Sequence, residues 1–228
     1  CDYWVSKSPE KVCLKDFTNI DQPILYTYRE LRSLADSIAF ELTKRGVGLG
    51  DRVGVLLSQG IGCAASHIAI WKIGAISIPL FKLFGPDALK MRLNDAQAKC
   101  TITNFEGSNG LLPNEFDRLI FDDIENTGEP FKTLSTKAET PAVLIYTSGT
   151  TGSPKGALHS QQILTGHLPG VSMSHNYLGH DRDCLWTPAD WAWIGGLFDV
   201  LMPGLALGVP VVAAKMKKFS PKGTIEII

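Results

Sequence analysis

The sequence predicts an α/β fold in which helices and mostly parallel sheets stack in layers. Short apolar runs, typical of buried strands, alternate with segments in which apolar residues recur at helical spacing. The connections between these segments are short, as in repeated strand–helix units. The chain has 228 residues, of which 44% are hydrophobic and 20% charged, so it can bury a sizeable core.

The first element that the pattern predicts is a helix that begins at Thr27. Thr27 and Glu30 have the spacing of a capping box, in which each side chain bonds a free backbone N–H of the first turn. Apolar residues then recur at helical spacing, and they are Leu31, Leu34, Ala35, Ile38, Ala39 and Leu42. Gly46 supplies the stop, because glycine suits the left-handed end of a helix.

Strand and helix patterns alternate after Gly46. We expect strands at 52–57, 76–80, 99–104, 118–121, 141–146 and 209–213, and helices at 63–73, 87–96 and 194–207. The polar stretch 125–140 contains Gly128 and Pro130 and predicts a surface loop, which could join two subdomains. The region between 156 and 184 shows little regularity, and an amphipathic stretch leads to the last residue.

Composition excludes several classes of protein. The net charge of −1 argues against a nucleic-acid binder or a membrane-surface binder, both of which are usually basic. Five cysteines without a C-x-x-C pair argue against a disulfide framework or a zinc knuckle and favour reduced thiols, as in the cytoplasm. No secretory signal pattern is visible at the N-terminus. The apolar stretch 194–214 includes Asp199, Pro203 and Pro210, so we expect a buried helix and strand there and no stable membrane insertion.

The segment 145–156 carries the strongest chemical signal. Its three glycines let the backbone turn tightly and approach a ligand, while several hydroxyls and the Lys155 ammonium lie beside exposed N–H groups. Such a concave set of donors suits a polyphosphate. The pattern is neither Walker A nor G-x-G-x-x-G. The simpler alternative is a glycine-rich surface turn whose hydroxyls are incidental.

The run Tyr-Thr-Ser-Gly-Thr-Thr-Gly-Ser-Pro-Lys-Gly at 146–156 resembles a family signature. The family comprises AMP-forming acyl-CoA synthetases, amino-acid adenylation domains and luciferases. Segments 26–31 and 71–79 resemble its first two core motifs, in the expected order. The resemblance covers most of the chain and implies the layered α/β fold of an adenylate-forming enzyme.

The resemblance implies a two-step reaction. A small carboxylic acid and ATP give an acyl-adenylate and pyrophosphate, and coenzyme A then takes the acyl group. ATP, Mg²⁺ and coenzyme A are the implied cofactors. By carry-over, the β- and γ-phosphates would be held by Thr147, Ser148, Thr150, Thr151 and Lys155, while Gly149 and Gly152 shape the loop. Loop donors and Mg²⁺ would offset the repulsion between the two anions.

A second segment narrows the resemblance. The run Asp190 to Gly196 is similar to the Asp-x-x-Trp-[Ile or Val]-x-Gly pattern of acetyl-type and medium-chain acyl-CoA synthetases, where Trp193 would line the acyl pocket. The alternative is that Trp191 and Trp193 are core or interface residues. Phe198–Asp199 also resembles a Phe-Asp pair of amino-acid adenylation domains, although its flanking residues fit less well.

The resemblance also concerns extent. We expect residues 1–228 to form part of an N-terminal AMP-binding domain, without the C-terminal domain of the family. Ligands for adenine, ribose and magnesium and the catalytic lysine would then lie beyond residue 228, so no catalytic residue and no metal ligand is assigned in this chain. We therefore expect the isolated chain to be inactive. The alternatives are the adenylation domain of a peptide synthetase and a non-catalytic nucleotide-binding module.

Overall fold

The computed structural model describes residues 1–109, 112, 114–147, 154–214 and 220–227. The chain divides into two compact units. Unit 1 comprises Cys1–Arg32, Ser58–Ala64 and Leu164–Ile228, and unit 2 comprises Ser33–Leu57 and Ala65–Ile163. The polar stretch 125–140 lies inside unit 2 and contains no helix or strand.

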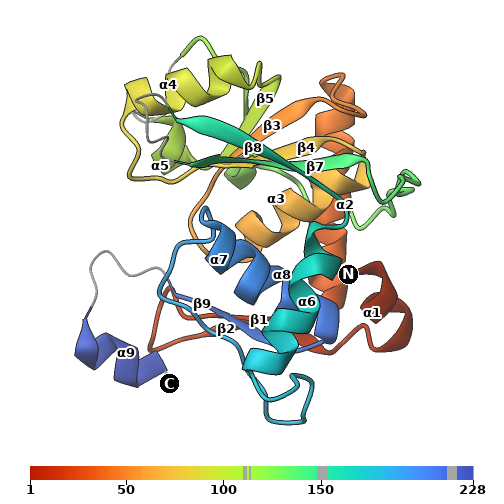
Figure 1. Ribbon diagram of the computed structural model, residues 1–228, viewed down its shortest axis with the longest axis vertical. Helices are drawn as coiled ribbons and strands as arrows, with labels where there is room; N and C mark the ends of the chain where they lie inside the picture. Colours follow the sequence, from red (N-terminus) through yellow and green to blue (C-terminus); the bar gives the residue numbers. More distant parts are fainter. Residues whose placement is uncertain (110–111, 113, 148–153, 215–219, 228) are drawn as a thin grey trace. The chain divides into compact units, whose positions relative to one another are not determined.

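Unit 2 is built on a six-stranded sheet (Figure 1). In spatial order its strands are β6 (Arg118–Ile120), β5 (Cys100–Thr103), β3 (Arg52–Leu56), β4 (Ile76–Pro79), β7 (Pro141–Thr147) and β8 (Lys155–Ser160). All neighbours pair in parallel except β7 and β8, which form an antiparallel hairpin. This order confirms the mostly parallel α/β fold. It adds β8, which the sequence did not predict.

The long helices between residues 28 and 95 begin and end within about two residues of the bounds that the sequence pattern predicts. They are α2 (Tyr28–Lys44), which starts in unit 1, α3 (Ile61–Lys72) and α4 (Pro86–Asp95), with two short unpredicted turns, α5 (Phe105–Ser108) and η1 (Phe121–Asp123). The capping box is confirmed: the backbone N–H of Thr27 donates to Glu30 Oε2 at 2.7 Å, and that of Glu30 donates to Thr27 Oγ1 at 3.2 Å. Gly46 has φ +73°, as the helix stop requires.

Two buried polar features lie in the core of unit 2. The Lys72 ammonium pairs with Asp36 Oδ1 at 2.5 Å, and both side chains are almost completely buried. His67 is also buried, with its ring 5.7 Å from that of Trp71, and its Nδ1 has no hydrogen-bond partner. Burial lowers the pKa of His67 from 6.5 to about 3, so the imidazole is neutral in the folded protein.

Unit 1 contains a three-stranded sheet that the sequence did not predict as a whole. Its strands are, in spatial order, β2 (Ile24–Thr27), β1 (Val12–Asp16) and β9 (Val211–Ala213). β1 pairs antiparallel with β2 and in parallel with β9, which comes almost two hundred residues later. Only β9 was expected from the sequence. The partner of β1 on its other side, β9, is distant in the sequence, so no local pattern reveals that pairing.

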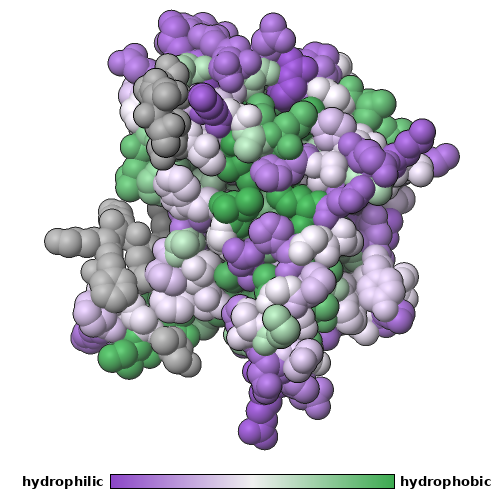
Figure 2. All heavy atoms as spheres, in the orientation of Figure 1, coloured by the Kyte–Doolittle hydropathy of each residue, from purple (hydrophilic) through white to green (hydrophobic). Residues whose placement is uncertain are grey.

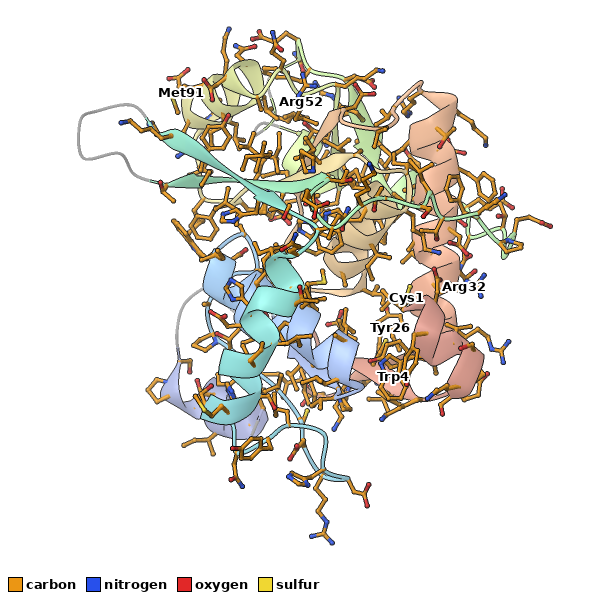
Figure 3. The ribbon with its side chains drawn as sticks, turned by 45° about the vertical axis from the view of Figure 1, so that its right-hand side comes forward. Cys1, Trp4, Tyr26, Arg32, Arg52 and Met91 are labelled. Carbon is orange, nitrogen blue, oxygen red and sulfur yellow. The ribbon has the colours of Figure 1, made fainter. Side chains whose placement is uncertain are left out.

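The helical elements of unit 1 are α1 (Asp2–Lys7), α6 (Ile163–Ser174), α7 (Ile194–Gly196), the π-helix η2 (Leu197–Leu201), α8 (Met202–Leu207) and α9 (Pro221–Ile227). α7, η2 and α8 follow one another without a break and form the apolar helix expected at 194–207. Trp4, labelled in Figure 3, belongs to α1, and its indole N–H donates to Ala206 O at 3.0 Å. Its ring stacks on Tyr28 at 5.8 Å. These contacts fix the N-terminal helix to the end of α8.

The surface mixes hydrophilic and hydrophobic residues on the face drawn in Figure 2. Among the described residues, no helix is both long and apolar enough to cross a membrane.

The five cysteines are all free thiols, and Cys13, Cys63 and Cys100 are buried. Burial raises the pKa of Cys13 and that of Cys100 to about 12, so these thiols remain protonated.

Candidate phosphate-binding and acyl-binding site

The predicted phosphate-binding segment begins at the end of β7 and ends at the start of β8. Thr147 and Lys155 face each other as the last pair of this hairpin, and both are exposed. The other five predicted ligands, Ser148, Gly149, Thr150, Thr151 and Gly152, lie outside the described residues. An exposed hydroxyl beside an exposed ammonium suits the oxygen atoms of a phosphate, so the described part of the segment fits a polyphosphate.

Close packing holds the two strands of this hairpin together. Gly156 lies opposite Tyr146, and a Cβ atom added at Gly156 would come within 2.9 Å of Leu144 Cδ1 and 3.4 Å of Tyr146 Cζ. A larger side chain at 156 would therefore push against both residues of β7. The glycine that follows Lys155 in the signature has a packing role, beside any freedom it gives the backbone.

Tyr146 fixes the end of β7 to helix α4. Its hydroxyl donates to Asp95 Oδ2 at 2.6 Å, and its ring is buried. Burial raises the pKa of Tyr146 above its ordinary value, and the Asp95 carboxylate raises it further. The guanidinium of Arg92, one helical turn before Asp95, lies 4.0 Å from the centre of the Phe84 ring and 5.9 Å from that of Tyr146. Tyr146, the residue next to Thr147, thus contacts α4 through its hydroxyl and lies near the guanidinium of Arg92 on the same helix.

Sequence reasoning missed the partners of Tyr146. Arg92 and Asp95 are three residues apart on a predicted helix, a spacing that places both side chains on one face. That spacing is the only signal the sequence offered. It could not show which strand the face contacts, because α4 and β7 are separated by more than forty residues.

The parallel strands of unit 2 all end at the edge where Thr147 lies, the edge at which α/β sheets bind ligands. Lys82 follows β4 there, and its side chain is only 10% exposed. Its ammonium pairs with Glu106 Oε2 at 2.8 Å and lies 3.4 Å from Asn104 Oδ1. This lysine is therefore already neutralised, whereas Lys155 is exposed.

The segment predicted to line an acyl pocket belongs to unit 1. Trp193 is the residue just before α7 and is 47% exposed, whereas Trp191 is fully buried. Trp191 is thus a core residue, and Trp193 presents an indole surface that can contact a ligand. Thr147 and Lys155 lie in unit 2 and Trp193 in unit 1.

Asp199 lies in the π-helix η2 and contacts α6. Its Oδ1 is 2.7 Å from His167 Nδ1, and the His167 ring lies 5.9 Å from that of Phe198. The pair lines a pocket of about 450 Å³ together with Gly166, Gly170, Val171, Ser174 and His175. The carboxylate of the Phe198–Asp199 pair is therefore engaged by an imidazole within its own unit.

Metal ligation has no candidate cluster in the part of the chain that the structure describes: no three His, Cys, Asp or Glu side chains come together there. Four lysines near the end of the sequence, Lys215, Lys217, Lys218 and Lys222, form a small basic run. Lys222 lies on α9 and its ammonium is 3.8 Å from Glu226 Oε1, while Lys215, Lys217 and Lys218 lie outside the described residues.

Comparison with known proteins decides the family. The family described as "AMP-binding enzyme" matches residues 1–228, the whole chain. The chain belongs to the AMP-binding enzyme family. It is 33% identical over 217 residues to an acetyl-coenzyme A synthetase of Bradyrhizobium diazoefficiens, a match that covers 80% of this chain and 33% of that protein. It is 30% identical over 240 residues to acetyl-coenzyme A synthetase 2 of Candida albicans, covering 90% and 35% respectively. The AMP-binding chain thus spans about a third of the length of the curated relatives it matches.

Solved structures share the fold of this AMP-binding chain. An acyl-CoA synthetase of Brucella canis matches all of the chain and 44% of its own, with a TM-score of 0.84 and 26% identity. A fatty acyl-adenylate ligase from L. pneumophila, in complex with acyl adenylate and pyrophosphate, has a TM-score of 0.85 at 20% identity and covers 99% of the chain and 39% of its own. The second likeness concerns the fold alone.

Proposed function

We propose that this AMP-binding chain is part of an AMP-forming acyl-CoA synthetase, which activates a small carboxylic acid with ATP and transfers the acyl group to coenzyme A. One observation carries the proposal. The chain matches acetyl-coenzyme A synthetases over at least 80% of its length, and its phosphate-binding signature connects β7 to β8 at the carboxyl edge of a parallel sheet.

The residues of the hairpin would manage charge in the first step. The Thr147 hydroxyl and the Lys155 ammonium would bind the β- and γ-phosphate oxygens, together with Ser148, Thr150 and Thr151. Lys155 would offset the repulsion between an incoming carboxylate and the phosphates, because its ammonium would lie beside the phosphate oxygens that carry the negative charge. Magnesium, when bound with ATP, would supply further neutralisation. Tyr146 and Gly156 would hold the two ends of the segment in place.

The acid would contact unit 1 through Trp193. A half-exposed indole supplies a flat apolar wall, which can limit the length of an acyl chain. An amino acid as substrate would need a free acidic group to bind its ammonium. Asp199, the candidate for that role, is engaged by His167, which favours simple carboxylic acids.

ATP–pyrophosphate exchange tests the proposal. The protein would be the product of the complete reading frame that contains these 228 residues. Acetate, butyrate, octanoate, benzoate and a pool of amino acids would be offered separately. Exchange driven by one of the simple acids is the expected result. Exchange with amino acids alone would assign the protein to peptide synthesis, and ATP binding without exchange by any acid would favour a non-catalytic module.

Lys155→Gln tests the phosphate-binding role of the hairpin. We expect exchange to fall by at least tenfold, about 1.4 kcal/mol of transition-state stabilisation, with a higher KM for ATP. The matched control is Lys137→Gln, another exposed lysine of unit 2, which should leave exchange unchanged. Equal rates for both variants and the unsubstituted protein would contradict the assignment of Lys155.

The isolated 228-residue chain is itself an informative sample. We expect it to form no acyl-adenylate at an enzymatic rate, because the residues assigned above bind and position substrates and none of them is a catalytic lysine or a magnesium ligand. Exchange at the rate of the complete product would contradict this expectation.

A further inference from the structure

We propose that Gln59 is a positioning residue that holds the segment bearing Trp193, and that it thereby helps to set which acid the protein accepts. The proposal rests on the proposed function. Gln59 lies between β3 and α3, in the short stretch 58–64 that belongs to unit 1. Gln59 and Thr187, the first residue of the segment it contacts, are 128 positions apart in the sequence.

The side-chain amide of Gln59 makes three hydrogen bonds. Its Nε2 donates to Ala189 O at 2.7 Å and to Thr187 O at 3.3 Å, and its Oε1 accepts from the backbone N–H of Ala214 at 3.1 Å. The side chain is 9% exposed. Two carbonyl oxygens at one end and an N–H at the other match a carboxamide in a single orientation. Gln59 therefore connects the segment before Trp193 to the residue after β9.

A series of hydrogen bonds continues from this anchor to Trp193. Asp190 Oδ1 accepts from the N–H of Ala192 at 2.8 Å, and Asp190 O accepts from the N–H of Trp193 at 3.1 Å. Trp193 O in turn accepts from the N–H of Leu197, at 2.9 Å. A displacement at Ala189 would therefore move the backbone that carries the indole.

Helix α7 confines the same backbone from the other side. A Cβ atom added at Gly196 would come within 2.5 Å of Asp190 O and 3.2 Å of Ala189 O. One added at the neighbouring Gly195 would come within 3.6 Å only of Asp199 Oδ2, an ordinary contact. The backbone at Ala189–Asp190 thus lies between the Gln59 amide and a helix position at which only glycine fits. This confinement is what places the Trp193 backbone.

A positioning role and a merely structural role predict different kinetics. If Gln59 only stabilised the fold, its loss would lower the amount of active protein without changing the preference among acids. If it positions Trp193, its loss changes KM for the acid and the order of preference, while KM for ATP stays the same. A displacement of about 1 Å at such a wall is enough to change rates severalfold or more.

The kinetic experiment uses four variants of the complete gene product in the exchange assay. In Gln59→Leu and Gly196→Ala we expect KM for the preferred acid to rise roughly tenfold, with KM for ATP within about twofold of the unsubstituted value. The matched controls are Gln22→Leu, an exposed glutamine of unit 1, and Gly195→Ala, and both should keep the unsubstituted preference. Unchanged acid preference in both test variants would overturn the inference.

A second readout does not depend on activity. The protein would be labelled with 5-fluorotryptophan, and the ¹⁹F resonance of Trp193 assigned by its loss in Trp193→Phe. We expect Gln59→Leu to shift or broaden this resonance and Gln22→Leu to leave it in place. If no acid supports exchange but the resonance moves, the proposed function fails and the positioning role stands. If the resonance is unaffected by Gln59→Leu, the positioning role is wrong whatever the kinetics show.

Discussion

Two buried tyrosine hydroxyls in this protein donate to partners far away in the sequence. The Tyr28 hydroxyl donates to Leu205 O at 2.7 Å, across 177 residues, and the Tyr146 hydroxyl donates to Asp95 across 51. An unmet hydrogen bond in a buried position costs free energy, so each of these pairs restricts how the chain can fold. The candidate phosphate ligands could be proposed from the sequence because a contiguous run carries them, and their role stays a prediction. The partners of Tyr146 could not, because only the folded sheet brings α4 to β7.

Tyr146→Phe removes one hydroxyl and tests the anchor of the hairpin. We expect the free energy of unfolding to fall by roughly 1 kcal/mol, since a hydrogen bond to a carboxylate is lost while the exposed Asp95 is hydrated again. Urea unfolding of the 228-residue chain measures it. Tyr177→Phe, at a tyrosine that is 67% exposed, should be neutral. Equal effects of the two substitutions would show that the Tyr146–Asp95 bond contributes nothing.

His67 predicts a specific dependence of stability on pH. Burial lowers the pKa of His67 from 6.5 to about 3. Between these two pH values the imidazole is therefore protonated in the unfolded chain and neutral in the folded chain. The stability that His67 contributes is therefore complete above pH 6.5 and is lost as pH falls towards 3, by up to about 1.4 kcal/mol per pH unit. His67→Phe should make this acidic decline shallower, as measured by urea unfolding at several pH values. His180→Phe, at an exposed position, should leave the slope unchanged.

Elements whose stability is encoded locally were the ones that the sequence predicted. α2 has its cap, its apolar face and its glycine stop within 20 residues, and its observed bounds agree with the prediction. β3, β4 and β5 are short runs of small and apolar residues that are buried at almost every position, as in strands covered on both faces. The regular strand–helix alternation between 27 and 104 therefore gave both the fold class and the order of its elements.

Elements that depend on distant partners were missed. β8 contains a glycine and is largely exposed, and it exists because β7 pairs with it along its whole length. α6 contains Gly166, Pro169 and Gly170, which disfavour a helix locally, yet it forms a helix of 12 residues. Its contacts with the rest of the unit include the buried side chain of Val171 and the His167–Asp199 pair. Local patterns could not reveal either element.

The capping box of α2 gives a prediction at this scale. Thr27→Ala should lower the free energy of unfolding by about 1 kcal/mol, because it removes the acceptor for the Glu30 N–H. Glu30→Ala should cost a similar amount, and the double variant less than the sum, since both changes break one reciprocal pair. Thr27→Ser keeps the hydroxyl and serves as the control. Strict additivity, measured by urea unfolding, would contradict the box.

Neither of the two units is one continuous segment of the sequence. The chain passes from unit 1 to unit 2 and back before it completes either, with changes near residues 32, 57, 64 and 163. All six strands of the larger sheet nevertheless lie between residues 52 and 160. The smaller sheet takes two strands, β1 and β2, from residues 12–27 and one, β9, from residues 211–213. The polar loop at 125–140 lies within unit 2.

This division predicts which pieces of the chain fold alone. A chain of residues 27–163 contains the capped α2 and the complete six-stranded sheet. We therefore expect it to unfold cooperatively in urea, as measured by far-UV circular dichroism. A chain of residues 65–163 lacks β3, which pairs with both β4 and β5, and we expect it to show no cooperative transition. Cooperative unfolding of the shorter piece would contradict the central role of β3.

The parallel pairing of β1 with β9 has a consequence for the order in which the protein is made. β1 leaves the ribosome almost two hundred residues before β9, the strand that completes its sheet. The strands of the larger sheet have by then all left the exit tunnel, so that sheet can form while synthesis continues. Until β9 is made, β1 has only the short hairpin partner β2, and an isolated two-stranded hairpin is marginal in water. The edge of β1 that pairs with β9 therefore stays unpaired while the residues between the two strands are synthesised.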